Sequence, residues 1–557
     1  MAKKLSRREF QRNVGALTLA GTGVASAGPS EAGTRRLSLP PLFYNNDGSF
    51  LFFPDPPRTP EDFVYEAVGR FAGTQIGAVV CHMFGFGDAV PLFPTRVREA
   101  EGIDRDSFLH VSEWKQQTCI RGLLDQGIDP WQLSLERAHE AGMQYWIGMR
   151  FNDLHGPRFQ WPSRFRVAHR EYELGENCGT GVHGPESVYG EKCVGLNFAI
   201  PEVRAHRLEL IEDVCTRYDA EGFEWDLLRE PGHYFPDIDR GRTILTGYLR
   251  EARALFQRIG TDRGRPLGFG IRVPATLEKC HEIGLELKTW IHEGLVDYIS
   301  PGVHWDTATG MPYGEFVALA KGTSCKVYAC TSEQVGPGYH RRPPAATLRA
   351  GAANAWRQGV DGIYMFNFHH HIGHNLKEAE VVFQELGDPK TLEHKDKLYT
   401  EVGCYDCLKK YPRSSDVFQA FVHQLPEALA EGKTKTVDVL VADDLDMARR
   451  RGMLQEIRLS LTVVGLTWED VLELNWNGRP LPENPRLEIP MNRVGPGPIE
   501  YQGNYIMSYD LTHGDWIRQG VNRLEATLRK RNPQVRVEMI LHSLELTIEY
   551  RTLPTRV

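Results

Sequence analysis

The stretch from residue 222 to residue 236 reads Gly-Phe-Glu-Trp-Asp-Leu-Leu-Arg-Glu-Pro-Gly-His-Tyr-Phe-Pro. Its first half is typical of a buried strand, in which alternate side chains point to the same face, so Glu224 and Asp226 share one face. Burying a carboxylate is costly unless the group is paired or hydrogen-bonded. The stretch therefore predicts a strand that carries either a buried ion-pair network or a catalytic centre, and Arg229 suits both.

Strand-like segments of this kind recur from Pro40 to about Phe368, each followed by a loop and an amphipathic helical segment. That alternation is typical of a parallel α/β fold. Eight units predict a closed (β/α)8 barrel over 38–387, with the active site at the carboxyl ends of the strands. An open doubly wound sheet is the alternative, although no Gly-x-Gly-x-x-Gly follows a strand. The predicted strands are 42–44, 77–82, 145–149, 222–227, 267–273, 296–300, 326–330 and 362–366.

The sequence changes character after about Gly387. Residues 388–435 read as a linker and connecting segment, beginning Asp-Pro-Lys. Apolar and polar residues then alternate in several segments between 436 and 557, which indicates half-buried antiparallel strands. Turn signals such as Asn477-Gly478 separate them. We expect a β-sandwich of jelly-roll type over 436–557 that serves as an accessory domain.

The chain has 557 residues and a net charge of -8, with an isoelectric point near 6.2. Such a chain has no global attraction to nucleic acid or anionic lipid. Residues 1–27 combine a basic start, a short apolar run and a small-x-small end, and Ser6-Arg7-Arg8-Glu9-Phe10 resembles the twin-arginine signal of bacteria. We expect export to the periplasm or the medium, with no membrane segment left after cleavage.

Acids lie at the ends of two predicted strands that face each other across the barrel. Asp226 ends the fourth strand, Glu230 follows in the next loop, and Glu333 follows the seventh strand. Glycosidic bond cleavage needs one acid that protonates the leaving oxygen and another that attacks the anomeric carbon or activates water. We expect the working pair to be Glu333 with either Asp226 or Glu230, while Glu224 and Arg229 contact the substrate or hold the site rigid.

Two resemblances add to this prediction. Residues 221–231 resemble the strand-four motif of bacterial glycosyl-hydrolase-like barrels related to family 10, and 361–368 resemble their eighth strand. The resemblance covers roughly residues 40 to 385, often with a sandwich appended. It implies a barrel glycosidase in which Asp226 is the strand-four acid and Arg229 its companion.

The second resemblance selects a different acid. Arg229-Glu230-Pro231 is similar to the Asn-Glu-Pro of the large clan of retaining glycosidases, in which the Glu is the acid/base and a Glu after strand seven is the nucleophile. That comparison implies Glu230 and Glu333. Arginine replaces the asparagine that contacts the sugar hydroxyl beside the anomeric carbon, so both pairs stay open.

Polar and aromatic residues follow the other predicted strands, as a carbohydrate cleft requires. Sugars are bound by flat aromatic rings and by side chains that make several hydrogen bonds. The candidate substrate-binding residues, besides Glu224 and Arg229, are His82, Arg150, Asn152, Asp153, His155, Tyr234, His304, Trp305, Asn367 and His369, with Trp161 as a further ring.

Histidines cluster after the eighth predicted strand and open a second hypothesis. His369, His371 and His374, joined by His82 or Asp153, are the residue types that bind zinc in metal-dependent hydrolases. The His-x-His spacing on an early strand is absent, so we expect no metal and no cofactor. A third hypothesis is a carbohydrate-binding protein without activity. Among the ten cysteines, Cys178 with Cys193 and Cys404 with Cys407 are candidate disulfides.

Overall fold

The computed structural model describes residues 37–52, 54–85, 89–97, 106–153, 162–174, 195–228, 234–303, 307–332, 345–366, 368, 381–402, 424–489 and 505–553. The expected export signal, 1–27, lies outside these residues.

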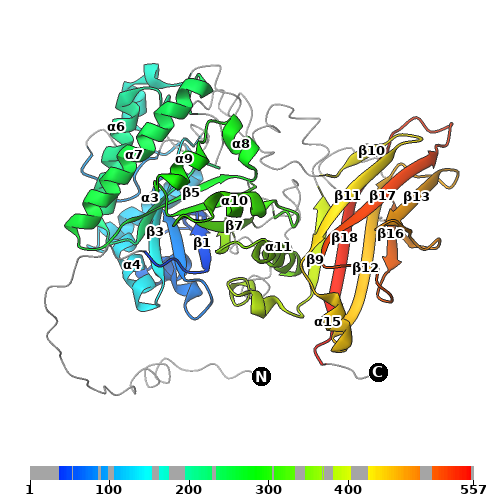
Figure 1. Ribbon diagram of the computed structural model, residues 1–557. Helices are drawn as coiled ribbons and strands as arrows, with labels where there is room; N and C mark the ends of the chain where they lie inside the picture. The colour runs from blue at the N-terminus through cyan, green and yellow to red at the C-terminus, as the bar shows by residue number, and fades with distance from the viewer. Residues whose placement is uncertain are drawn as a thin grey trace. The chain divides into compact units, whose positions relative to one another are not determined.

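Eight parallel strands form a closed barrel in chain order (Figure 1). Each strand pairs with the next, and the last pairs with the first through registers such as Phe43 with Tyr364. Closure confirms the predicted (β/α)8 barrel and all eight predicted strands, and the open sheet is wrong. The strands are β1 (Leu42–Asn46), β2 (Ala78–His82), β3 (Gln144–Arg150), β4 (Gly222–Asp226), β5 (Gly268–Pro274), β6 (Tyr298–Gly302), β7 (Lys326–Ser332) and β8 (Gly362–Phe366).

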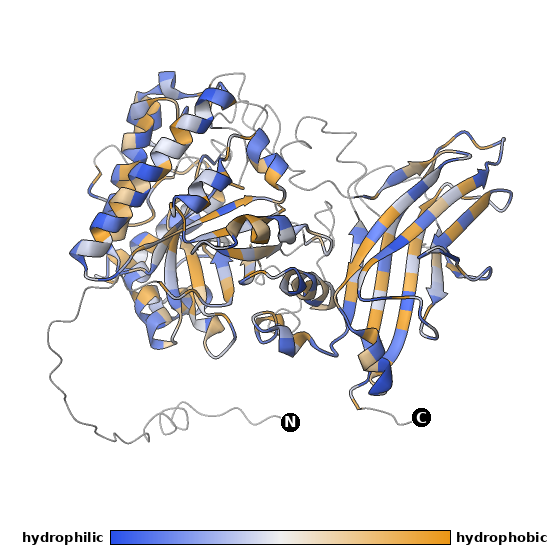
Figure 2. Cartoon of the chain, viewed as in Figure 1, coloured by the Kyte–Doolittle hydropathy of each residue, from blue (hydrophilic) through white to orange (hydrophobic). Residues whose placement is uncertain are grey.

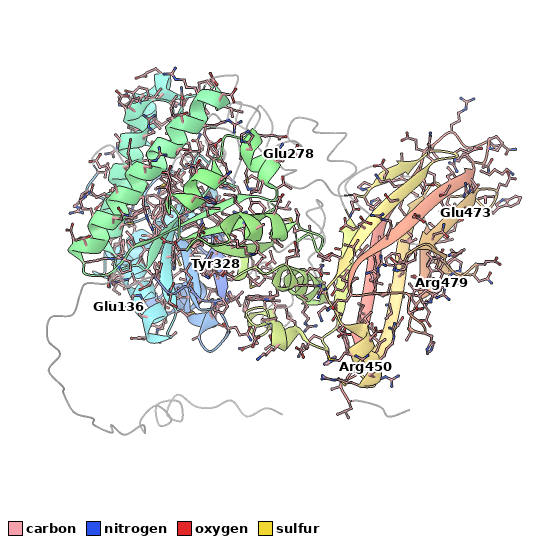
Figure 3. All side chains as sticks on the ribbon, viewed as in Figure 1. Glu136, Glu278, Tyr328, Arg450, Glu473 and Arg479 are labelled. Carbon is pink, nitrogen blue, oxygen red and sulfur yellow. The ribbon has the colours of Figure 1, made fainter. Side chains whose placement is uncertain are left out.

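Helices surround these strands, and their starts follow local chemistry. The Asp129 side chain accepts hydrogen bonds from the backbone N–H groups of Trp131 and Gln132, and Pro130 occupies the first helical position. Figure 3 labels Glu136 and Glu278 on helices outside the strands. The helices are α2 (Pro60–Ala67), α3 (Val111–Leu124), α4 (Pro130–Glu140), α5 (Arg164–Ala168), α6 (Pro201–Arg217), α7 (Ile238–Asp262), α8 (Leu277–Glu282), α9 (Leu287–His292), α10 (Tyr313–Ala320) and α11 (Ala345–Arg357).

The barrel interior is filled by large rings that lie beside glycines. Trp146, Tyr298 and Tyr328 point inward and are almost completely buried. A Cβ atom on Gly270 would lie 2.1 Å from Cζ of Tyr298, and one on Gly222 would lie 2.2 Å from Cζ3 of Trp146. Glycine on the neighbouring strand therefore provides the space for each ring. The outward faces of the strands carry the apolar side chains that pack against the helices.

In the described residues after the barrel, ten further strands form two antiparallel sheets. One has the order β10-β18-β12-β16-β15, with β9 also on β18, and the other has the order β11-β17-β13-β14. Apolar and polar bands alternate along these strands (Figure 2), and the apolar residues of both sheets share one core. The strands are β9 (Lys397–Val402), β10 (Glu427–Leu429), β11 (Thr434–Val441), β12 (Leu454–Val464), β13 (Val471–Trp476), β14 (Arg479–Pro480), β15 (Arg486–Glu488), β16 (Tyr505–Asp510), β17 (Gly520–Lys530) and β18 (Met539–Tyr550).

Strand pairing identifies the sandwich as a jelly roll. The pairs β13–β14, β12–β16, β11–β17 and β10–β18 are nested in sequence, and successive pairs alternate between the two sheets. This is the expected jelly-roll arrangement. The segment 388–435, expected to be a linker, contains β9 and β10, which both pair with β18. Within the described ranges, no helix is both long and apolar enough to span a membrane.

Candidate active site

Seven of the predicted site residues lie in the described part of the chain. They are His82, Arg150, Asn152, Asp153, Glu224, Asp226 and Tyr234. The others lie outside the described residues, as do Trp161, the rest of the 369–374 histidine loop and the candidate disulfide cysteines. These others are His155, Arg229, Glu230, His304, Trp305, Glu333, Asn367 and His369.

Asp226 is the last residue of β4 and faces the barrel interior, completely buried. Its Oδ2 lies 2.5 Å from Nη1 of Arg272, and its Oδ1 accepts a hydrogen bond of 3.0 Å from the backbone N–H of Leu228. Arg272 is the register partner of Asp226 on β5. The strand-four acid therefore forms a fully buried ion pair with an arginine from the neighbouring strand.

Arg272 is a site residue that the sequence analysis missed. Its Cζ lies 3.3 Å from the centroid of the Phe366 ring, so the guanidinium stacks on the last residue of β8. Desolvation lowers the pKa of Arg272, but Asp226 and other neighbours raise it by more. The sequence did carry a signal for it: along this strand Arg272 follows Gly268 and Gly270 at every second position, on the face that points inward.

Glu224 lies two residues before Asp226 and points to the same interior. Its Oε2 accepts a hydrogen bond of 2.5 Å from the Tyr298 hydroxyl, and its Oε1 accepts one of 2.6 Å from the Tyr364 hydroxyl. Nδ2 of Asn45 donates to Oε1 over 3.2 Å. Burial raises the pKa of Glu224 to about 7, although the two phenols act to lower it, and Asp226 adds to the increase.

His82 lies in the same interior layer. Its Nε2 is 3.1 Å from Nδ2 of Asn45, which links it to the Glu224 cluster. A Cβ atom on Gly148 of the next strand would lie 2.7 Å from the His82 ring, so glycine admits the imidazole. Register through Gly148 therefore aligns His82 with Glu224, while Asp226 lies two residues further along β4.

Arg150 and Asp153 form a second buried charge cluster. Nη1 of Arg150 lies 3.0 Å from Oδ2 of Asp153, and Nη2 lies 3.2 Å from Oδ2 of Asp47. All three side chains are at most 4% exposed. Asp47 follows β1 and was not among the predicted site residues. The structure thus pairs two predicted sugar-binding residues with each other, and this arrangement fixes the ends of β1 and β3.

Asn152 and Tyr234 make their described hydrogen bonds to the backbone. Nδ2 of Asn152 donates to the carbonyl of Leu196, whose N–H donates to Oδ1, each over 3.0 Å. The Tyr234 hydroxyl donates to the carbonyl of Leu227 over 2.5 Å, and its buried ring lies 4.9 Å from that of Phe151. Both side chains hold neighbouring segments in place, and the Tyr234 ring belongs to the core.

The described residues bring together charges and proton carriers suited to acid–base chemistry. Asp226 is held as one half of an ion pair, and Glu224 is poised to exchange a proton near neutral pH. Groups of three or more His, Cys, Asp or Glu residues placed for a metal ion are absent from the described part of the chain. The predicted histidine loop lies outside the described residues.

Comparisons with known proteins find glycosidases among the proteins to which this chain is similar. No family model matches the chain. A segment is 24% identical over 220 residues to the glycosyl hydrolase DigH of Escherichia coli K12, and equally to that of Shigella flexneri, covering 32% of this chain. The chain spans about half, 47%, of the length of these relatives.

Solved structures with a similar arrangement are also carbohydrate enzymes. A maltogenic α-amylase of Thermotoga neapolitana has a TM-score of 0.35 and 11% identity, with 87% of this chain and 98% of that chain covered. An α-L-fucosidase of Paenibacillus thiaminolyticus has a TM-score of 0.40 and 12% identity, with 62% and 48% covered. At these TM-scores and identities the likenesses assign no function to this chain.

Proposed function

We propose that the protein is a glycoside hydrolase that cleaves a poly- or oligosaccharide with a pair of carboxyl groups at the barrel mouth. The observation that carries the proposal is the position of Asp226, a buried carboxylate at the carboxyl end of β4 in a closed parallel barrel. The name of the matching relatives, glycosyl hydrolase, supports the reaction class.

The ion pair with Arg272 suggests the role of Asp226. A carboxylate held by a guanidinium is charged, which suits attack on the anomeric carbon or removal of a proton from water. The leaving oxygen then needs a proton from another group as the C–O bond breaks. Glu333 is the proposed donor for Asp226, whereas in the other pair Glu230 is the acid and Glu333 the nucleophile. In the family 10-like comparison Arg229 accompanies Asp226, and in the retaining clan Glu230 takes the acid role.

Single amide substitutions test the carboxyl mechanism. Asp226→Asn, Glu230→Gln and Glu333→Gln are compared on a broad panel of plant and algal glycans, and we expect at least two of them to reduce kcat by about 10²-fold or more. Asp239→Asn is the control, because Asp239 is 93% exposed on α7. Thermal melts check that each variant folds. Wild-type turnover in all three variants refutes the carboxyl mechanism.

Product stereochemistry, followed by NMR, assigns the pair. Retention at the anomeric carbon requires carboxyl groups about 5 to 5.5 Å apart, and inversion requires about 6.5 to 9.5 Å. The proposed chemistry uses side chains and water. Metal analysis of the purified protein, repeated on a His369→Ala/His371→Ala variant, tests the metal-dependent alternative, which is favoured if bound metal and activity disappear together.

We also propose that residues 1–27 direct export by a twin-arginine route. The basic start and the Arg7-Arg8 pair support this proposal. Expression with an Arg7→Lys/Arg8→Lys substitution should retain the protein in the cytoplasm, whereas the wild type should reach the periplasm or medium with its leader removed. Equal export of both forms contradicts the twin-arginine route.

A further inference from the structure

Four buried residues in the barrel interior carry polar atoms without hydrogen-bond partners among the described residues. These atoms are Nε and Nη2 of Arg272, Oγ of Ser300, Oγ of Ser332 and Oδ1 of Asn45. Each residue is completely buried. Because nine in ten or more buried polar groups in proteins are hydrogen-bonded, an unpaired group needs an explanation such as a bound ligand or water.

Strand register and one ring contact relate these residues to Arg272. Ser300 is the register partner of Arg272 across β5 and β6. Ser332 and Asn45 are the register partners of Phe366 on its two sides, and the Phe366 ring stacks on the Arg272 guanidinium. Ser300 is therefore the direct register neighbour of Arg272, while Ser332 and Asn45 flank Phe366, the ring that covers one face of the guanidinium.

The open edge of Arg272 has a specific chemistry. Asp226 occupies Nη1 and Phe366 covers one face, which leaves the Nε and Nη2 edge. The two N–H groups of that edge are parallel and match the two oxygens of a carboxylate or of a sulfate. The thiol of Cys330 interacts with Arg272, but burial raises the pKa of this thiol to about 11, so it is neutral and only a weak acceptor.

A balance of donors and acceptors favours an acceptor-rich ligand. The guanidinium edge only donates, the hydroxyls of Ser300 and Ser332 can donate or accept, and Oδ1 of Asn45 only accepts. A sugar hydroxyl both donates and accepts, but a carboxylate or sulfate ester accepts at every oxygen. The guanidinium edge therefore suits an anionic substituent better than a neutral one.

A cleft in the sandwich has the same charge preference. A concavity of about 1260 Å³ is lined by Arg449, Arg450, Arg451 and Arg551, against the acids Glu456 and Asp510. This cleft is basic in a chain whose net charge is -8. A basic cleft attracts anionic polymers, and the attraction weakens as salt screens it.

We infer that the substrate is an acidic glycan, whose carboxylate or sulfate binds the Nε and Nη2 edge of Arg272 together with the hydroxyl of Ser300. Arg272 is in this proposal a specificity-determining residue, and the cleft beside Arg450 holds a further stretch of the same polymer. That the bound glycan is cleaved rests on the proposed function, whereas that it binds does not.

Binding measurements test the inference without requiring turnover. The probes are pectate and alginate for carboxylates, a sulfated fucan and a carrageenan for sulfates, and laminarin and mannan as uncharged glycans. Calorimetry on the wild type should show binding of at least one acidic glycan, about tenfold or more tighter than of either uncharged glycan. Carboxylate-bearing and sulfated probes identify which anion is preferred.

Two variants locate the binding. Arg272→Lys keeps the charge that pairs with Asp226 but loses the two-pronged edge, and Ser300→Ala removes a hydroxyl that has no described partner. Each should weaken acidic glycan binding, Arg272→Lys by about tenfold or more. Thr347→Val is the control, because the Thr347 hydroxyl is also buried and unpartnered but lies on α11. It should leave binding unchanged.

The outcomes separate this inference from the proposed function. Preference for uncharged glycans, failure of every acidic probe to bind, or equal binding by wild type and both variants overturns the inference, even if glycans are hydrolysed. Acidic glycan binding that depends on Arg272, in a protein without turnover, supports the inference and overturns the hydrolase proposal. For the sandwich cleft, Arg450→Ala/Arg451→Ala should weaken polymer binding at low salt, and Arg486→Ala/Lys530→Ala is the charge-matched control.

Discussion

Glu224 is the residue whose ionisation most affects the barrel. Its carboxyl group is completely buried, yet three donors from β1, β6 and β8 surround it. Burial raises its pKa from 4.5 to about 7. Below pH 4.5 the folded and unfolded chains both hold this proton. As the pH rises from 4.5 to 7, the unfolded chain releases the proton first, so folding stability falls.

Replacing Glu224 with glutamine should remove that pH dependence. The pKa difference corresponds to a loss on the order of 3 kcal/mol in the free energy of unfolding above pH 7. We therefore expect Tm to fall less between pH 5 and pH 8 in Glu224→Gln than in the wild type, since the amide cannot release a proton. Thermal melts across this pH range measure the effect. Parallel curves for the two proteins contradict a raised pKa at Glu224.

The sequence predicted the described site only in part, because a sequence indicates which residues are buried but not which residues they contact. Asp226 was identified because an acid at the end of an apolar strand is unusual. Arg272, its partner, is 46 residues away and was missed because nothing local links the two. Arg150 and Asp153 were predicted to meet substrate, but side chains three residues apart also reach each other, and the structure pairs them.

The strand that carries Gly270 shows how elements of the barrel fit together. Tyr298 of the next strand occupies the space above Gly270, and from there its hydroxyl donates to Glu224. Any side chain at position 270 would displace the Tyr298 ring. Glycines in β4, β5 and β8 thus determine which strands contribute large rings to the interior.

Gly270→Ala should destabilise the barrel by roughly 1–3 kcal/mol, because the added Cβ overlaps the Tyr298 ring. Chemical denaturation measures the change in the free energy of unfolding. Gly122→Ala is the matched control: Gly122 lies in α3 with no atom near its added Cβ, and alanine there should stabilise by about 0.5–1 kcal/mol. Equal changes in the free energy of unfolding for the two substitutions would show that the Tyr298 ring moves aside at no energetic cost.

Long apolar segments made the barrel elements predictable, while short strands were not. All eight barrel strands were predicted because buried parallel strands are almost continuously apolar. β10 has only three residues, and β9 gains its order from β18, whose partner residues are more than 140 positions later. Neither strand has a local pattern that distinguishes it from a connecting segment, so 388–435 was predicted as a linker.

At the scale of the whole molecule, specific hydrogen bonds join the barrel to the sandwich. Nδ2 of Asn354, on α11, donates to the carbonyl of Thr309 over 2.7 Å and to that of Leu440, on β11, over 2.8 Å. Thr309 in turn exchanges two hydrogen bonds of 3.0 Å with the backbone of Thr400, on β9. The two domains therefore share buried polar contacts that neither satisfies alone.

Asn354→Ala should lower the free energy of unfolding by about 1–3 kcal/mol, because two buried carbonyls lose their donor. Differential scanning calorimetry measures the change and also shows whether the barrel and sandwich still unfold together. Thr347→Val, on the same helix, removes a buried hydroxyl that has no described partner and should leave Tm nearly unchanged. A similar Tm loss in both variants would mean that the hydrogen bonds of Asn354 contribute no more to stability than the Thr347 hydroxyl does.

The central position of β18 has a consequence for the timing of synthesis. This strand pairs with β9, β10 and β12, all of which leave the ribosome earlier. Until residues 539–550 emerge, those three strands present unpaired backbone edges, the feature that most readily recruits strands of other chains. All eight barrel strands have been synthesised by residue 366, so none of them waits for a later partner strand. A ribosome stalled after the barrel would therefore hold a folded first domain joined to a second one that is still open to aggregation.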